Sequence, residues 1–470
     1  MTRVGYHAFH TYERHPGRDG ANRAYEEIGR LLSDETRLDV VPHDIRSLLD
    51  DEFQAIRVLG ACDVVVASVG PHAHFYHFLR QKHGLSFRIV RDVRTALWNG
   101  YLLQECLTSP LSRAEDSVIH SSAYSRDLFT RLLGNSMGER LVCYPLMRWF
   151  PPQTEVTARG RRPRNKITVG YVGRLTDDKG FPEALALLNE LCRRNPGKFR
   201  LVAVGEGSPP YGSAAVSRSL TQPDLSAYSW RPAVTWTSIW DCYRDFDVLF
   251  FPSTSTLETL GRVLVEAMYS GLPVVASEHG ATSELLDPKA LIKTTYDVTR
   301  DYSAHFAAPL ASVDIQQAAD LIADESFVAS EGHWLYRDDA ARFAALLAGG
   351  NGSVSSAMRP GTVLQRSFID RVEASDLTRP INPEEAMRAI GRLIGPFLRL
   401  NGRGVSRLAM LGELTWKSRH RRKTIEFARR AIGRGEDFTN IGGVDLQLSH
   451  LLQFYPWFRI APDGQEGASA

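Results

Sequence analysis

Short apolar runs alternate with longer amphipathic segments through most of this 470-residue chain. This alternation is typical of βαβ units, in which parallel strands buried on both faces are connected by helices. The candidate strands of the first half are RVGYHAF, DVVVASV, FRIVRDV, SVIHSS and RLVCYPL. Those of the second half are ITVGYVG, FRLVAVG, AVTWTS, DVLFFPS and PVVAS. The sequence therefore predicts an α/β protein with two doubly wound, Rossmann-like domains of parallel sheet.

Composition separates the two halves and sets a third segment apart. A linker is indicated by PPQTEVTARGRRPR, which is rich in proline and arginine and has no hydrophobic periodicity. A chain this long exceeds what one core can bury, so we expect domains at residues 1–155 and 165–348. They would face a ligand cleft at the carboxyl ends of their strands. We expect residues 357–470 to be a mostly helical extension, since NPEEAMRAIGRLIGPFLRL and RRKTIEFARRAIGRG have helical apolar spacing.

The composition is that of an ordinary soluble globular protein, with 43% hydrophobic and 23% charged residues. A formal net charge of +2 gives no global field that attracts nucleic acid, and no nucleic-acid partner is expected. The first residues, MTRVGYHAFH, lack the apolar stretch of a signal peptide, so we expect a cytoplasmic protein. Reduced thiols are expected for five widely spaced cysteines, Cys62, Cys106, Cys143, Cys192 and Cys242.

Two cations follow the first strand of the second half. In YVGRLTDDKGF, Gly173 permits a tight exit from the strand and leaves Arg174 and Lys179 near its carboxyl end. Two cations at this place suit a phosphate or diphosphate, and a guanidinium can chelate two oxygens. The alternative is that both are surface charges balanced by Asp177 and Asp178.

Two glutamates flank a predicted helix start in FPSTSTLETLGRVLVEAM. If the helix starts near Thr259, the backbone N–H groups of Thr259, Leu260 and Gly261 form an anion site. Glu258 then precedes the helix, where it can accept hydrogen bonds from sugar hydroxyls. Glu266 lies about two turns into the helix, and a carboxylate suits two vicinal hydroxyls such as those of a ribose. In the structural alternative, Glu258 favours the helix dipole and Glu266 is solvated, although its apolar neighbours argue against solvation.

The second half resembles the donor-binding half of glycosyltransferase family 4, a group of retaining enzymes with the GT-B fold. The resemblance rests on GRLTDDKGF, VAVGEGS and PSTSTLETLGRVLVEAMYSGLPVVASEHGATSELL. It is dense over residues 167–286 and follows only the outline of the family in the first half. The family pattern is an arginine and a lysine after the first strand, followed by two glutamates with seven residues between them. Arg174, Lys179, Glu258 and Glu266 match this pattern in order.

This resemblance implies a role for each matched residue. Arg174 and Lys179 would neutralise the diphosphate of a nucleotide sugar, and residues 259–261 would add backbone N–H groups. Glu266 would hold the ribose of the nucleotide. Glu258 would hold the transferred sugar or its reacting face.

The resemblance also implies roles outside the motif. Trp236 lies where the family lines its base pocket, although a core position is the alternative. Gly20, with Gly17 before it, corresponds to the glycine-rich loop of the first domain that approaches the donor phosphate. GT-B chains usually end with a helix that crosses back to the first domain, and HWLYRDDAARFAALLAG is the candidate.

The first half departs from the family at one strand. Family members commonly place a histidine, often followed by aspartate, at the end of a middle strand, whereas FRIVRDVRT has Arg91 followed by Asp92. Arg91, Asp92 and His120, which lies in SVIHSS, are the acceptor-side candidates. The alternative for Arg91 and Asp92 is an ion pair at a strand end.

No metal is expected, because GT-B enzymes generally neutralise the diphosphate with protein cations. Four histidines do cluster in PHAHFYHFLRQKH, but their spacing matches no zinc motif and no carboxylate lies among them. They would instead lie in a loop and helix or line the acceptor cleft. They are His72, His74, His77 and His83.

Basic residues outnumber acidic ones over residues 388–434 and peak in KSRHRRK. Such a segment can contact anionic lipid peripherally, an acidic acceptor or nucleic acid, and the alternative is a solvated helical face neutralised elsewhere in the fold.

The resemblance implies a cofactor-free enzyme that moves a sugar from a nucleoside diphosphate sugar to a hydroxyl or amine, with retention of anomeric configuration. UDP-sugar is the favoured donor and GDP-sugar the alternative, and the acceptor is a small molecule or a glycan. Two other functions stay open. One is a GT-B phosphorylase or nucleotide-dependent sugar synthase. The other is a catalytically silent sugar-nucleotide-binding subunit, which the missing histidine keeps open.

Overall fold

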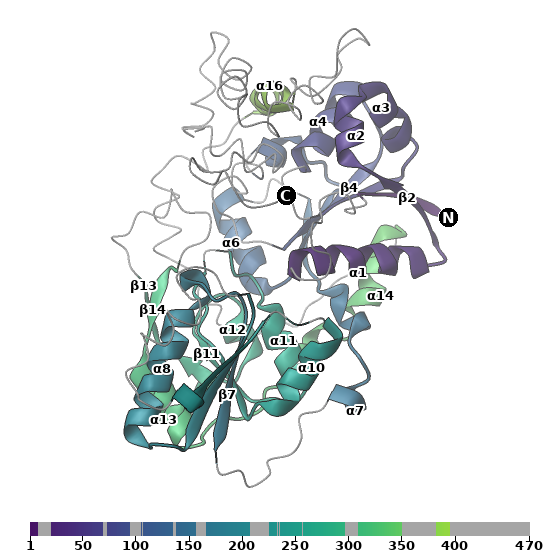
Figure 1. The fold of residues 1–470 in the computed structure, drawn as a ribbon. Coiled ribbons are helices and arrows are strands. Elements are labelled where there is room, and N and C mark those ends of the chain that lie inside the picture. The colour runs from purple at the N-terminus through teal and green to yellow at the C-terminus, as the bar shows by residue number, and fades with distance from the viewer. Residues whose placement is uncertain are drawn as a thin grey trace, which may run out of the picture.

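The structure of the protein is a computed structural model, which describes residues 1–7, 20–68, 73–94, 105, 107–134, 138–156, 166–206, 225–232, 234, 236–255, 257–296, 309–349 and 382–394. Two six-stranded sheets organise this part of the chain (Figure 1). Every strand pairing within the two sheets is parallel. Two parallel-sheet α/β units are therefore confirmed.

The first sheet has the strand order β2-β1-β3-β4-β5-β6. Its strands are β1 (Thr2–His7), β2 (Leu38–His43), β3 (Val64–Ala67), β4 (Arg88–Val93), β5 (Ser117–His120) and β6 (Glu139–Val142). The helices around it are α1 (Gly20–Asp34), α2 (Ile45–Asp50), α3 (Glu52–Gly60), α4 (Ala73–His83), η2 (Ser109–Leu111), α6 (Ala123–Leu133), η3 (Pro145–Trp149) and α7 (Gln153–Val156). The predicted strands of the first half are all present, and α7 occupies part of the predicted linker.

The sequence prediction missed strand β2. This strand is at the edge of the sheet, paired with β1 alone, and it contains Pro42. An edge position tolerates proline because one side of the strand needs no ladder hydrogen bond. The four middle residues of β2 are not buried, so the continuous apolar run that marks the central strands is absent.

The second sheet has the strand order β12-β11-β10-β7-β8-β9. Its strands are β7 (Ile167–Val172), β8 (Phe199–Val204), β9 (Tyr228–Arg231), β10 (Val248–Phe251), β11 (Val274–Ser277) and β12 (Leu291–Ile292), and β13 (Thr294–Tyr296) pairs antiparallel with β14 (Ala311–Val313). The helices are η4 (Asp177–Lys179), α8 (Phe181–Arg194), η5 (Leu225–Ala227), α10 (Trp236–Asp245), α11 (Arg262–Tyr269), α12 (Thr282–Leu285), η6 (Pro288–Ala290) and α13 (Ile315–Ala323).

One predicted strand of the second half, AVTWTS, is wrong. The strand beside β8 is β9, which ends at Arg231, and α10 begins at Trp236. None of the four side chains of β9 is buried, so this edge strand has no apolar signature. Helix α10 instead buries Ile239, Trp240 and Tyr243, which share one face at helical spacing.

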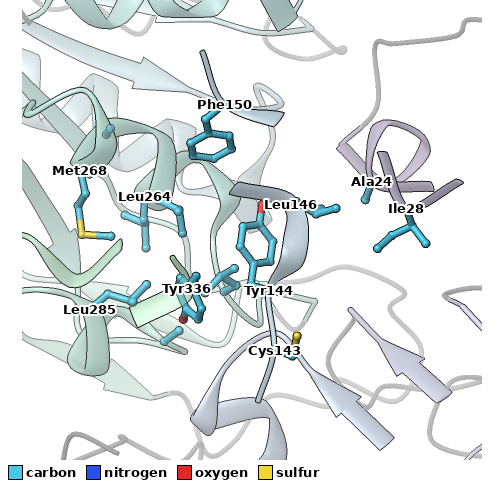
Figure 2. Packing of buried hydrophobic residues seen from close by; sticks show 14 of the residues in the cluster. Ala24, Ile28, Cys143, Tyr144, Leu146, Phe150, Leu264, Met268, Leu285 and Tyr336 are labelled. Atoms are coloured by element: carbon cyan, nitrogen blue, oxygen red, sulfur yellow. The ribbon is translucent and has the colours of Figure 1, made fainter. Parts of the chain in front are cut away.

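A single apolar cluster joins the two halves. Tyr144 and Phe150, which flank η3, lie in the same cluster as Leu264 of α11 and Tyr336 (Figure 2). On the other side of η3, α1 contributes Ala24 and Ile28 to this cluster. The carboxyl half of the chain is therefore packed directly against α1 and η3 of the first half.

The predicted crossing helix is present. It is α14 (Asp339–Leu347), preceded by η7 (Gly332–Tyr336), and it packs against η3. Arg88 of β4 donates to the carbonyl oxygens of Leu346 and Leu347, the latter at 2.9 Å. A guanidinium at the carboxyl end of a helix satisfies carbonyl groups that have no partner within the helix.

Of the predicted extension, the structure describes α16 (Pro383–Ile394), which packs against α4 and η2. RRKTIEFARRAIGRG and most of the basic segment 388–434 lie outside the described residues. Within the described part, we find no helix with the length and hydropathy needed to span a bilayer. Four cysteines are buried free thiols, namely Cys62, Cys143, Cys192 and Cys242, whereas Cys106 lies outside the described residues.

Candidate active site

The exit from β7 is shaped by two glycines with positive φ. Gly173 has φ of 154°, and its N–H donates to the carbonyl of Val204 at 3.0 Å. Gly180 has φ of 71°, and a Cβ there would lie 2.6 Å from the carbonyl oxygen of Pro252. Only glycine combines that conformation with so close an approach. The turn between the two glycines, which contains Arg174 and Lys179, is therefore held tightly against the loop after β10.

Lys179 and Glu258 meet across this junction. The Nζ of Lys179 lies 2.7 Å from Oε2 of Glu258, which also accepts from the hydroxyl of Ser253 at 3.1 Å. Burial alone would raise the pKa of Glu258, but the charge and hydrogen bond of Lys179 outweigh it, and the pKa is lowered. The carboxyl is therefore an anion at neutral pH, ready to accept hydrogen bonds.

Arg174 pairs with Asp178 rather than with Glu258. Its Nη2 lies 3.1 Å from Oδ2 of Asp178, and half of its side chain is exposed. Asp178 is buried and also accepts from the hydroxyls of Thr176 at 2.6 Å and Ser255 at 2.9 Å. The sequence left open that Asp177 and Asp178 balance both cations. In the structure an aspartate of this turn pairs with Arg174 alone, because Lys179 pairs with a glutamate from another βα unit.

His279 borders the same loop. Its Nε2 donates to the carbonyl of Ser255 at 3.1 Å, and Nδ1 lies 3.2 Å from the hydroxyl of Tyr296. Burial lowers the pKa of His279 to about 4, so the ring is neutral near pH 7. The imidazole therefore fixes the loop before Glu258 without adding charge beside that carboxylate.

Helix α11 begins later than the sequence predicted. Its first residue is Arg262, and the capping residue Gly261 has φ of 77°. A left-handed residue cannot continue a right-handed helix, so the predicted start near Thr259 is wrong. Thr259 is buried against the first half instead. Its hydroxyl donates to the carbonyl of Arg94 at 3.0 Å, and its carbonyl accepts from Ser122 at 2.7 Å.

Glu266 is buried inside α11 and accepts two hydrogen bonds. The hydroxyl of Tyr243 donates to its Oε2 at 2.6 Å, and Nε of Arg262 donates to its Oε1 at 2.8 Å. Burial raises the pKa of Glu266 against the opposing charge of Arg262. The solvated position considered from the sequence is thus ruled out. Arg262 also forms an ion pair with Glu27 of α1, with nitrogen–oxygen distances of 2.9 and 3.0 Å.

The acceptor-side candidates from β4 have partners within the fold. Arg91 is buried, lies 2.6 Å from Oε1 of Glu105, and donates to the carbonyls of Ala67 and Ser68. Asp92 pairs with Arg94 at 2.9 Å. Both residues therefore form ion pairs, but with partners other than each other.

His120 ends β5 beside Val93 of β4. It is fully buried, its Nδ1 lies 3.2 Å from the hydroxyl of Ser125, and burial holds its pKa well below the usual range. Its ring packs edge-on against Phe129. These contacts make His120 a buried, neutral side chain of the first half.

The remaining sequence candidates are placed as follows. Gly20 is the first residue of α1, and Trp236 is the first residue of α10, with its side chain outside the described part. His74 and His77 are buried in α4, His83 lies 2.9 Å from Glu52, and His72 is outside the described residues. No group of three potential metal ligands occurs among the residues that the structure describes.

Comparison with known proteins finds a family-model match in the second half. Residues 153–303 match the family model described as glycosyl transferases group 1. The match covers 151 of the 470 residues. Arg174, Lys179, Glu258 and Glu266 all fall within it.

Curated relatives match part of the same region. A D-inositol 3-phosphate glycosyltransferase of Segniliparus rotundus is 36% identical over 138 residues, which are 28% of this chain and 29% of the relative. A GDP-mannose-dependent alpha-mannosyltransferase of Mycobacterium tuberculosis is 30% identical over 136 residues, or 29% and 32% of the two chains. The chain therefore matches about a third of the length of these relatives.

A solved structure is similar in fold over most of the chain. The sucrose-phosphate synthase of Thermosynechococcus elongatus aligns with a TM-score of 0.50 and 15% identity, covering 84% of this chain and 98% of that one. At this identity the likeness is one of fold, and it agrees with a GT-B arrangement of the two sheets.

The region matched by the family model also contacts α6 of the first half, through a residue that sequence reasoning missed. Glu284 of α12 accepts from the backbone N–H groups of Ala123 at 2.9 Å and Tyr124 at 3.1 Å. Glu284 is buried, and burial raises its pKa to about 7. No local signal marks it, because its partners are more than a hundred residues away in sequence.

Proposed function

We propose that this chain is a retaining glycosyltransferase that moves a sugar from a nucleoside diphosphate sugar to an acceptor hydroxyl or amine. The observation that carries the proposal is the 2.7 Å contact between Lys179 and Glu258. It joins the cation after β7 to the carboxylate after β10, and both belong to the matched glycosyltransferase domain. A diphosphate and a sugar are adjacent in a nucleotide sugar, so a cation and a carboxylate in contact suit that junction.

Arg174 and Lys179 are the proposed catalytic cations, because negative charge accumulates on the leaving diphosphate as the bond to the sugar breaks. Fixed positive charge placed at that point stabilises the transition state more than the ground state. Half of the Arg174 side chain is exposed, which leaves guanidinium N–H groups for phosphate oxygens. Glu258, held anionic by Lys179, is proposed to accept hydrogen bonds from the transferred sugar.

The rest of the donor has proposed contacts on both halves. Glu266 would hold the ribose and Trp236 would line the base pocket. Backbone at Gly20, Gly173 and residues 259–261 would approach the phosphates. Arg91, Asp92 and His120 stay candidates for the acceptor side. We favour a UDP-sugar as donor, with a GDP-sugar as the alternative, and a small molecule or glycan as acceptor.

Metal independence is part of the proposal, since two side-chain cations lie in the turn after β7. We further propose domains at residues 1–155 and 165–348, an extension at 357–470, and a cytoplasmic location. Peripheral contact of the basic segment 388–434 with a membrane is proposed from its charge alone.

The test is a panel of UDP- and GDP-sugars, with binding followed by calorimetry and turnover by release of the nucleoside diphosphate. We expect at least one donor to bind and to be consumed when an acceptor is present. Release of orthophosphate instead would identify a phosphorylase, and binding without any turnover would identify a silent binding subunit. Failure of every nucleoside diphosphate and nucleotide sugar to bind would refute the proposal.

A further inference from the structure

We propose that Glu27 of the first half is a positioning residue for the ribose site, because it draws Arg262 away from Glu266. The inference rests on the proposed function, in which Glu266 holds the ribose of the nucleotide. Glu27 belongs to α1, outside the donor-binding half. It would determine how many hydrogen bonds Glu266 can accept from a ligand.

The contacts form one chain of charge across the two halves. Nη1 and Nη2 of Arg262 donate to Oε2 and Oε1 of Glu27 at 2.9 and 3.0 Å, and its Nε donates to Oε1 of Glu266 at 2.8 Å. The hydroxyl of Tyr243 donates to Oε2 of Glu266 at 2.6 Å. The two Nη groups of Arg262 therefore bind both carboxylate oxygens of Glu27, and its Nε–H binds one oxygen of Glu266.

The geometry determines how many hydrogen bonds the carboxylate of Glu266 can still accept. An ionised carboxylate offers about four lone-pair positions. Among the described side chains, Tyr243 and Arg262 take one position each on Glu266. About two positions remain, which is the number that the two vicinal hydroxyls of a ribose need.

Without Glu27, the same arginine would compete for those positions. Arg262 and Glu266 are four residues apart on α11, a spacing at which the two side chains meet on one helix face. A guanidinium released from Glu27 can turn to chelate both oxygens of Glu266, the geometry that arginine and carboxylate prefer. One of the two remaining acceptor positions would then be lost.

Glu27 is well held for this task. Its side chain is fully buried, and its neighbours Ala24 and Ile28 belong to the apolar cluster around η3 (Figure 2). Its carbonyl also accepts from the indole of Trp149 at 3.0 Å. The packing of α1 therefore fixes the position of Glu27. The contact between α1 and α11 would therefore strengthen the binding of a ribose to Glu266. A bound ribose would in turn stabilise that contact, because such coupling is reciprocal.

The test compares the binding affinities of two probes, UDP and 2′,3′-dideoxy-UDP, which differ in the two ribose hydroxyls. If wild type binds only guanine nucleotides, GDP and 2′,3′-dideoxy-GDP take their place. We expect wild type to bind the ribonucleotide at least tenfold more tightly than the dideoxy form, and Glu27→Gln to lose about tenfold of this preference, the scale of one charge-assisted hydrogen bond. Adding Arg262→Met to Glu27→Gln is expected to restore the preference to within about threefold of wild type.

The restoration separates positioning from general stability. Asp339→Asn is the matched control, because Asp339 is also a buried carboxylate that contacts the first half, through the N–H of Tyr144 at 2.6 Å. It should lower the melting temperature and leave the probe preference unchanged. An unchanged preference in Glu27→Gln, or a double variant with less preference than Glu27→Gln, would overturn the inference. Wild type that binds neither nucleotide would instead refute the proposed function.

Discussion

Glu284 gives the sharpest test of how the two halves are held together. Its carboxylate accepts from the first two N–H groups of α6, a helix of the other half. Two effects oppose each other at this carboxyl. Burial favours the neutral acid, whereas the helix N-terminus favours the anion. The pKa of about 7 means that burial prevails.

The magnitude follows from the shift in pKa. The carboxyl of Glu284 has an ordinary pKa of 4.5 and a folded-state pKa of about 7. A group whose pKa is raised on folding stabilises the fold fully below its unfolded pKa, and this contribution is lost as the pH rises through the folded pKa. A difference of this size corresponds to about 3 kcal/mol, lost between pH ~4.5 and ~7.

The assay is urea unfolding of wild type and Glu284→Gln between pH 5 and 8, because the glutamine does not titrate. Taking the difference between the two proteins at each pH removes every other titrating group. We expect the free energy of unfolding of wild type to fall relative to Glu284→Gln by about 2 to 3 kcal/mol across this range. A difference that rises with pH would mean that the N-terminus of α6 outweighs burial, and our reasoning would be wrong.

Three further predictions concern the proposed donor site. Arg174→Ala or Lys179→Ala should lower turnover by about a hundredfold or more, the scale for loss of one electrostatic stabiliser, and unchanged kinetics in both would remove them from the site. Full activity should survive exhaustive chelation, whereas a strict need for an added divalent ion would contradict side-chain neutralisation. Glu266→Gln should weaken calorimetric binding of the bare nucleoside diphosphate, while Glu258→Gln should keep that affinity and lower kcat at saturating donor; the opposite pattern would reverse their roles.

Most of the fold was predictable because parallel strands buried on both faces are continuous apolar runs. VVVA of β3 and VLFF of β10 are such runs, and every one of their residues is buried. The edges of the sheets lack this signal. β2 and β9 expose side chains on at least one face, so an apolar-run criterion missed the first and placed the second too late in the chain.

The site was predictable as a set of residue types but not as a set of contacts. Arg174, Lys179, Glu258 and Glu266 follow from motif spacing, which is local. The pairing of Lys179 with Glu258 joins residues 79 positions apart and depends on how β7 and β10 lie side by side. The i,i+4 spacing of Arg262 and Glu266 in RVLVE is a local signal, although the sequence analysis did not use it to predict an ion pair. The contact of Arg262 with Glu27, 235 positions away, has no local signal.

The carboxyls of Glu258, Glu284 and Asp339 fall into two groups with opposite pH dependence. Glu258 has a lowered pKa, so its ion pair with Lys179 stabilises the fold above the ordinary pKa of a glutamate and is lost in acid. Glu284 and Asp339 have pKa values raised by burial to about 7 and about 6, so their contribution to the free energy of unfolding falls as the pH rises. The two groups are therefore never at full strength together, because Glu284 contributes fully only below pH ~4.5 and Glu258 only above it. Above pH ~7 the stabilisation from Glu284 and Asp339 is lost, whereas that from the Lys179–Glu258 pair persists.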